Sequence, residues 1–234
     1  MEISIFVTIW SMALSPGDVQ RHILGDPLDF LAAEEAVVAV ELYQSETGDN
    51  LPPLHDVPAP TSMVEIRVGS ADAAKELVES DNFKQLLLNK QAFSAPVEKI
   101  DLEILEPVHY PIPGQATTPP RTASLSFVVR YYGPVENQAE FVEFYTTNHP
   151  PLLAEFPGIR NVLCYLPLGW RDTQEITDSS VIIGNEVVFD DLDSLNRALA
   201  SDALGPVMAD SEKFASYGVS THYVMQRELI YQRD

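Results

Sequence analysis

The chain has 234 residues, 45% of them hydrophobic, which is enough to bury the core of one large or two ordinary domains. Its 35 acidic residues outnumber the 14 lysines and arginines, and the formal net charge of -21 repels nucleic-acid backbones and anionic membrane surfaces. We therefore expect neither nucleic acid nor a membrane as a partner.

The first residues, Met-Glu-Ile-Ser-Ile, contain no basic region, and Arg21 is the first arginine, so a secretory signal is not expected. No apolar run approaches the ~20 residues that span a bilayer. The single cysteine, Cys164, cannot close an internal disulfide. Together these features predict a cytoplasmic protein.

The first half of the chain reads as strand, helix, strand, strand, helix, strand. Aromatic and β-branched residues predict strands near 2–10, 35–44, 62–68 and 97–106, and apolar residues at helical spacing predict helices near 16–33 and 71–90. Ser70 is the expected cap of the second helix. A proline-rich loop at 48–61 joins the second and third strands.

A proline-rich stretch at 107–120 should form no regular ladder, so we expect it to be a stiff linker. Beyond it the same order of elements returns, with strands near 123–132, 159–166, 180–189 and 219–231 and helices near 137–148 and 191–200. Asn137 and Glu140 resemble a capping box, Asp191 caps the last helix, and the Pro150-Pro151 pair should stop the longer one. The loop at 167–179 matches that at 48–61, and both are expected to form the rims of a pocket.

The two halves align as an internal repeat. An offset of 121 residues sets Glu65 against Glu186, and an offset of 122 superposes the strands at 3–10 and 125–132. We predict an α+β fold of two ferredoxin-like β-α-β-β-α-β repeats, at 1–107 and 122–234, joined by the linker 108–121. Two such sheets facing each other enclose a barrel within one chain, which would be a monomer (a pseudo-dimer) or a homodimer.

One segment carries a family resemblance: residues 144–161 read Phe-Tyr-Thr-Thr-Asn-His-Pro-Pro-Leu-Leu-Ala-Glu-Phe-Pro-Gly-Ile-Arg-Asn. The pattern Phe-Tyr-x-x-x-His-x-Pro-Leu followed by Pro-Gly resembles the EthD family of the dimeric α/β barrel superfamily. The likeness covers residues 123–231 well. The first half shares only the topology and the Asp-Pro-Leu at 26–28, and it has Gly25 where the second half has His149.

The resemblance implies a small-molecule cleft between sheet and helices and no organic cofactor. It leaves the reaction open, because a fold does not fix a function.

We expect the candidate catalytic residues to be His149, Tyr145 and Arg130. An imidazole near neutral pKa is the commonest general acid or base, and Tyr145 lies one helical turn earlier. A purely structural role for His149, at the negative end of a helix dipole, is the alternative. Arg130 lies on a strand face shared with Ser126, where Glu186 is its expected partner in a structural ion pair, or in a pair that orients an anionic oxygen.

The expected ligand-binding residues are aromatic or polar, and two of them, Trp10 and Tyr132, lie at equivalent strand ends. Because neighbouring residues of a strand point to opposite faces, only one of His222 and Tyr223 can line the interior. The set comprises Trp10, Tyr132, Asn148, Trp170, Glu186 and His222.

Several site classes lack support in the sequence. The five histidines show no paired metal-ligand spacing, so no metal is expected. Neither a dinucleotide nor a phosphate-loop fingerprint, nor the Gly-x-Ser-x-Gly of serine hydrolases, is present.

We therefore predict a cofactor-independent enzyme that acts by acid/base catalysis on a small apolar cyclic or aromatic, polyketide-like metabolite. The reaction would be an isomerisation, cyclisation or dehydration. The alternatives are a cofactor-free monooxygenase, a non-catalytic carrier that holds a reactive metabolite, and a scaffold with no ligand.

Overall fold

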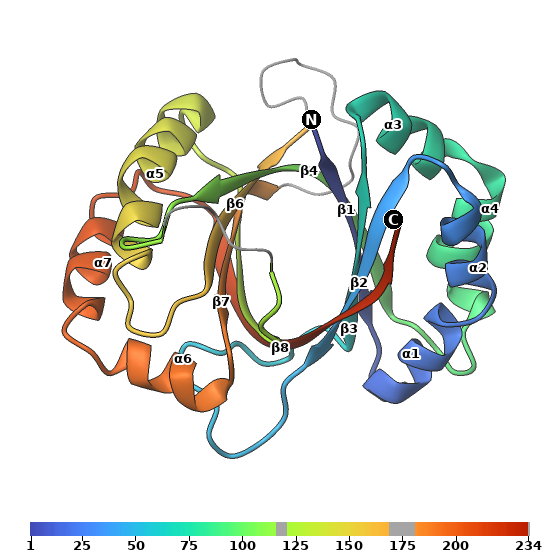
Figure 1. Ribbon diagram of the computed structural model, residues 1–234, viewed down its shortest axis with the longest axis horizontal. Coiled ribbons are helices and arrows are strands. Elements are labelled where there is room, and N and C mark those ends of the chain that lie inside the picture. The colour runs from blue at the N-terminus through green and yellow to red at the C-terminus, as the bar shows by residue number, and fades with distance from the viewer. Residues whose placement is uncertain (116–120, 169–180, 234) are drawn as a thin grey trace.

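The computed structural model describes residues 1–115, 121–168 and 181–233. Its strands form one closed antiparallel barrel in the order β1-β3-β2-β8-β5-β7-β6-β4 (Figure 1). The strands are β1 (Ile3–Trp10), β2 (Val37–Ser45), β3 (Ser62–Val68), β4 (Lys99–Tyr110), β5 (Leu125–Tyr132), β6 (Asn161–Pro167), β7 (Val181–Phe189) and β8 (Val219–Gln232). Each strand forms hydrogen-bonded ladders with two neighbours, which closes the sheet on itself.

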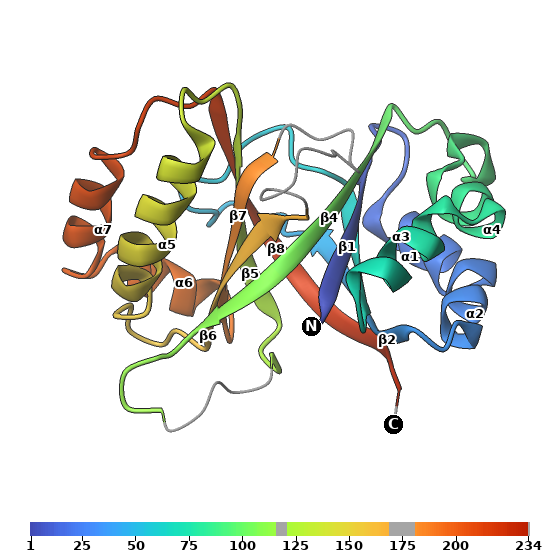
Figure 2. The same ribbon diagram turned by 90° about the horizontal axis from the view of Figure 1, so that it is seen from above.

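Helices cover the barrel on two opposite sides, as the views in Figures 1 and 2 show. One group consists of α1 (Pro16–Ile23), α2 (Asp26–Ala33), α3 (Ala71–Glu79), α4 (Asp81–Phe83) and the short turns η1 (Lys84–Leu88) and η2 (Lys90–Ala92). The other consists of α5 (Gln138–Leu153), α6 (Leu192–Leu199) and α7 (Leu204–Ser211). The predicted α+β class with a closed barrel is confirmed.

The core has three parts. Two apolar clusters lie between the sheet and its helices, one in each half, and a third lies inside the barrel. On β5 the two faces separate cleanly: Phe127, Val129 and Tyr131 pack toward the helices, whereas Val128 packs inside the barrel. This separation follows from the two-residue period of a strand.

The two long helices predicted for the first half are each broken. Gly25 precedes α2, which has a proline in its first turn, and this position is where a proline is tolerated. Ser80 ends α3 in an extended conformation, and its hydroxyl accepts the Phe83 N–H at the start of α4. The predicted caps Ser70, Asn137 and Asp191 all accept backbone N–H groups.

The prediction that Pro150 and Pro151 stop the helix is wrong, because α5 continues to Leu153. A proline at 150 cannot donate to the Thr146 carbonyl, four residues earlier. The Tyr110 hydroxyl donates to that carbonyl instead, at 3.0 Å. A side chain from β4 therefore satisfies the group that the helix leaves open.

The prediction that the proline-rich stretch 107–120 forms no regular ladder is wrong for residues 107–110. β4 runs through Pro107 to Tyr110, pairing with β1 up to Leu105 and with β6 beyond it. After Leu105 the strand has one neighbour only, and a proline is accommodated where one side needs no hydrogen bond. The sequence prediction also missed α7.

Candidate functional site

A pocket of about 230 Å³ lies between α5, α6 and α7 and the outer face of β5, β7 and β8. Leu54 and Met208 at its wall are half-exposed, so the pocket opens to solvent beside them. Leu54 comes from the loop at 46–61, in agreement with the predicted rim. The lining residues are mostly apolar and comprise Leu54, Phe127, Val129, Tyr131, Tyr145, His149, Leu153, Phe156, Asn185, Val187, Leu195, Leu199, Leu204, Val207, Met208, Ser211, Tyr217, Ser220 and His222.

His149 on α5 contributes a buried imidazole to the pocket wall, and Nδ1 lies 3.0 Å from Oδ2 of buried Asp210 on α7. A carboxylate can only accept here, so Nδ1 carries the proton and Nε2 keeps its lone pair. Burial lowers the pKa of His149, and the Asp210 carboxylate partly offsets that shift. The imidazole is therefore neutral at pH 7, in the tautomer of a general base.

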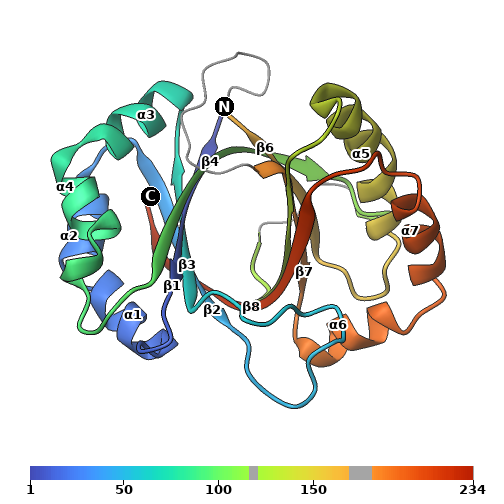
Figure 3. The same ribbon diagram turned by 180° about the vertical axis from the view of Figure 1, so that it is seen from behind.

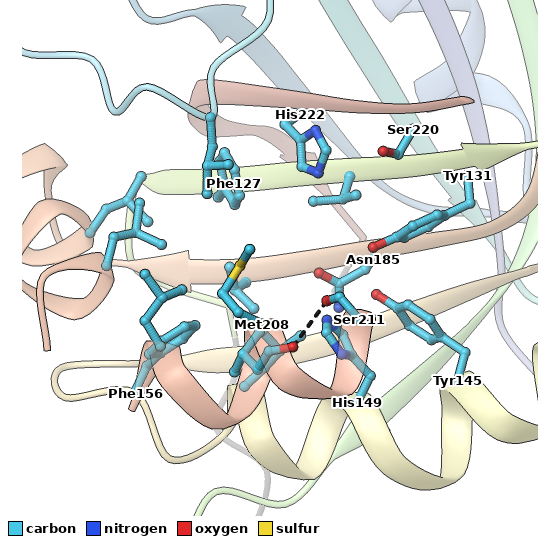
Figure 4. Close-up of a pocket in the computed structure, with 18 of the residues that line it drawn as sticks. Phe127, Tyr131, Tyr145, His149, Phe156, Asn185, Met208, Ser211, Ser220 and His222 are labelled. Atoms are coloured by element: carbon cyan, nitrogen blue, oxygen red, sulfur yellow. Dashed lines mark hydrogen bonds between the residues drawn. The ribbon is translucent and has the colours of Figure 1, made fainter. Parts of the chain in front are cut away.

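Two tyrosines lie beside His149. The ring centroids of Tyr145 and His149 are 4.8 Å apart. The side chains of Tyr145 and Tyr131 share a hydrogen bond. Burial raises the pKa of both phenols, so both remain protonated donors at neutral pH. Figure 4 shows the two hydroxyls turned toward each other and toward Asn185 at one end of the pocket.

His222 on β8 lines the opposite wall, above Phe127 in Figure 4. Its ring stacks on Phe127 with centroids 5.9 Å apart, and Nδ1 lies 3.4 Å from Oδ2 of Asp56. The His222 backbone N–H also donates to that oxygen at 2.8 Å. Burial lowers the pKa of His222, and Asp56 partly offsets the shift.

Arg130 does not join His149 and Tyr145. It is buried inside the barrel, on the face of β5 opposite the pocket, with its guanidinium over the rings of Phe6 and Tyr165. The predicted Arg130–Glu186 pair does not form, because Arg130 Nε donates to Glu103 Oε2 at 2.9 Å. The charge partner comes from β4, a strand that the sequence argument did not consider.

Glu186 instead binds Arg121, at the end of the proline-rich stretch. The Arg121 side chain is buried in the barrel, and sequence reasoning missed it because it lies outside any periodic element. Its guanidinium donates hydrogen bonds of 2.8 to 3.1 Å to Tyr43, Tyr165, Glu41, Glu65 and Glu186.

Trp10 and Tyr132 lie at one mouth of the barrel, where they surround a space of about 10 Å³ together with Arg130 and Tyr223. That space is the size of one water molecule, so these residues do not line the pocket in which His149 lies. His222 and Tyr223 face opposite sides of the sheet, as the alternation predicts.

Asn148 is exposed, and its amide donates to the Phe144 carbonyl at 2.7 Å rather than reaching the pocket. Trp170 lies outside the described residues. Asp210, Tyr131 and Asn185 line or support the pocket and were missed. The alternation of β5 could have pointed to Tyr131, but no local signal marks Asp210.

Within the described ranges no group of three or more His, Cys, Asp or Glu side chains could hold a metal ion. Over the same residues none of the helices has the length and apolarity that a membrane crossing requires.

The closed antiparallel barrel with helices on two sides, and a pocket under one helical layer, define the class as the dimeric α/β barrel. Residues 134–218 match the EthD domain, so the resemblance seen in residues 144–161 is confirmed over that segment. No curated protein matches the sequence.

Three solved structures share the fold over nearly the whole chain. An anthrone oxidase-like protein has a TM-score of 0.65 at 14% identity, covering 99% of this chain and 92% of its own. A proposed monooxygenase from Fusobacterium nucleatum has a TM-score of 0.57 at 10% identity, covering 100% of this chain and 96% of its own. Another proposed monooxygenase, from Lactobacillus acidophilus, has a TM-score of 0.53 at 12% identity, covering 97% of this chain and 95% of its own.

Proposed function

We propose that this protein is an enzyme that binds a small, largely apolar cyclic or aromatic metabolite between α5, α7 and the sheet, and transfers a proton with His149 as the base. One observation carries the proposal: His149, whose Nδ1 lies 3.0 Å from the buried carboxylate of Asp210, forms part of the wall of a pocket of about 230 Å³. An imidazole fixed in one tautomer beside an apolar cavity suits isomerisation, cyclisation or dehydration of a ketone-bearing ring.

In the proposed step Nε2 of His149 takes a proton from the carbon next to a carbonyl group. The electron pair of that C–H bond forms the enolate, whose oxygen accepts a hydrogen bond from a phenol. Tyr131 and Tyr145 are suited to this role because burial keeps both protonated. Asp210 stabilises the imidazolium, and return of the proton to another atom completes the isomerisation. The side chain is the proton acceptor, so the step requires no cofactor.

The test uses 2-tetralone, a bicyclic ketone whose α-hydrogens exchange with solvent. We expect the purified protein to accelerate α-hydrogen exchange in D₂O, followed by proton NMR, and His149→Gln to reduce that acceleration by about a hundredfold or more. His109→Gln is the control, because His109 is exposed on β4 and does not line the pocket. Equal acceleration by wild type and His149→Gln would reject the assignment.

A cofactor-free monooxygenase is the second candidate, and it would begin with the same proton removal. An enolate that is electron-rich enough reacts with oxygen directly. The fold relatives described as an anthrone oxidase-like protein and as proposed monooxygenases make anthrone a suitable probe. Oxygen uptake with anthrone that depends on His149 would favour this version, whereas ligand recovered unchanged after long incubation would favour a carrier.

We also propose that the halves at 1–107 and 122–234 are copies of one ferredoxin-like unit. The strand orders β4-β1-β3-β2 and β8-β5-β7-β6 are equivalent, which supports the proposal. Glu65 and Glu186, aligned at an offset of 121, each accept a serine hydroxyl of the first strand of their half, from Ser4 and Ser126 respectively. On this view only the second copy kept the histidine.

A further inference from the structure

We propose that His222, held by Asp56, is a second ligand-binding group of this pocket, and that it receives the far hydroxyl of a fused-ring hydroxyaromatic ligand. The inference deepens the proposed function and rests on its pocket. It begins from the position of the two imidazoles: Figure 4 shows His222 and His149 on opposite walls, each with its ring turned into the cavity.

Asp56 reaches His222 from the other half of the molecule. The loop at 46–61, here called the arm, leaves the barrel between β2 and β3 and passes under it toward α6 (Figure 3). The Asn196 amide on α6 donates to the Asn50 carbonyl at 2.9 Å. The arm therefore bridges the halves, and the half that lacks the family histidine contributes to the site.

Two further contacts fix the arm along β8. The Asp56 N–H donates to the His222 carbonyl at 2.9 Å, and His55 Nδ1 accepts the Val224 N–H at 3.0 Å. The His222 N–H returns a 2.8 Å bond to the Asp56 carboxylate. This reciprocal pairing holds the Asp56 carboxylate, which is half-exposed, beside the ring, so it acts as a positioning group.

The carboxylate sets the hydrogen-bonding role of the ring. Asp56 can only accept from Nδ1–H, so Nε2 of His222 is an acceptor. In the same way, Asp210 makes Nε2 of His149 an acceptor. Two acceptors face each other across apolar walls. A complementary ligand carries a hydrogen-bond donor at each end of an apolar body. Since no lysine or arginine is among the residues found to line the pocket, a neutral diol fits better than an anion.

The volume sets the size of that body. An apolar cavity of about 150 Å³ binds benzene. The pocket of about 230 Å³ therefore has room for more than a single ring. The chemistry and size together indicate a hydroxylated fused-ring compound with hydroxyl groups at opposite ends.

The experiment compares 2,6-dihydroxynaphthalene with 6-methoxy-2-naphthol, which keeps the second oxygen but loses its donor. Affinities follow from quenching of ligand fluorescence under argon. We expect wild type to prefer the diol by about tenfold, the ratio that ~1.4 kcal/mol of a hydrogen bond gives. His222→Phe should remove the preference, and Asp56→Asn should reduce it, because the Nδ1 proton is no longer fixed. Asp49→Asn, the same charge change at an exposed position of the arm, should retain it.

Equal affinities of wild type for both naphthols, or a preference that survives in both His222→Phe and Asp56→Asn, would overturn the inference. Failure of wild type to bind either probe at millimolar concentration would overturn the ligand class. The naphthol measurement needs no turnover and the tetralone exchange needs no second hydroxyl. If the diol preference is found but the tetralone exchange is not accelerated, the proposed function alone is wrong. If the exchange is accelerated but the diol preference is absent, the second binding group alone is wrong.

Discussion

The pKa of His149 results from two opposing influences at the scale of single residues. Burial disfavours the imidazolium, while the carboxylate of Asp210 favours it, and burial is the larger effect. A base that must be neutral to act loses activity as pH falls through its pKa in the folded protein. The acidic limb of the rate profile should therefore lie below pH 6.5, the ordinary value for histidine.

Asp210→Asn should lower the pKa of His149 further, because the group that favours the imidazolium is removed. The acidic limb of tetralone exchange should move to lower pH, while the maximal rate falls because the tautomer is no longer fixed. NMR titration of the His149 ring carbons checks the pKa directly. Asp202→Asn, a change at an exposed position beside α7, should alter neither the pKa of His149 nor the exchange rate. An upward shift in Asp210→Asn would contradict this account of the pair.

At the scale of elements, α5 depends on a neighbouring strand. Pro150 removes one donor of the helical ladder, and the Tyr110 hydroxyl satisfies the Thr146 carbonyl from β4. This contact compensates for the donor that Pro150 lacks, in the last part of a helix that continues to Leu153.

A double-mutant cycle tests that dependence. Tyr110→Phe should lower the free energy of unfolding by about 1 kcal/mol in the wild-type background, the typical contribution of a hydrogen bond. In a Pro150→Ala background the new N–H can donate to Thr146, so the same change should have a smaller effect. Urea denaturation measures all four proteins. Identical effects in both backgrounds would show that the hydroxyl does not replace the helical donor; the contact of Tyr110 with Cys164 is common to both and cancels.

At the scale of the whole molecule, Arg121 joins the two halves of the barrel interior. It contacts Glu41 and Glu65 of the first half and Glu186 of the second. Burial raises the pKa of Glu41, and Arg121 opposes that shift. Although burial acts the same way on Glu186, the guanidiniums of Arg121 and Arg227 hold its pKa below the ordinary value. The barrel interior thus contains a buried charge network beside its apolar cluster.

Arg121→Met should lower the free energy of unfolding by roughly 3–5 kcal/mol at pH 7, because buried carboxylates lose their partner. Without Arg121 the pKa of Glu186 rises above its unfolded value. A raised folded pKa gives stability that is present at low pH and lost as pH rises, so the deficit should shrink toward pH 5. Denaturation at both pH values tests this.

A triple variant with Glu65→Gln and Glu186→Gln should recover much of the lost stability, since neutral amides need no cation. Arg160→Met, which breaks an exposed ion pair with Asp190, should change little at either pH. A deficit in Arg121→Met that does not depend on pH would indicate lost packing rather than lost charge.

The comparison of sequence with structure is clearest on β5. Alternation separates Tyr131 from Tyr132, but it does not say which face meets the ligand, so the sequence argument chose Arg130 and Tyr132, which lie inside the barrel. The pocket lies on the opposite face of β5, the face to which Tyr131 belongs. The motif at 144–161 pointed to His149 and Tyr145, and both line this pocket because they lie one turn apart on the same helix.

The amino-acid sequence alone determined what depends on neighbours along the chain: the order of the strands, the caps at Ser70, Asn137 and Asp191, and the α+β class. Only the tertiary structure decided the pairs formed between distant segments. Asp210 meets His149 across 61 residues, Asp56 meets His222 across 166, and Arg121 enters the barrel between the halves. The physical reason is that hydrophobic periodicity encodes which face of an element is buried, whereas a buried polar group is satisfied by whichever partner the closed fold brings within hydrogen-bond distance.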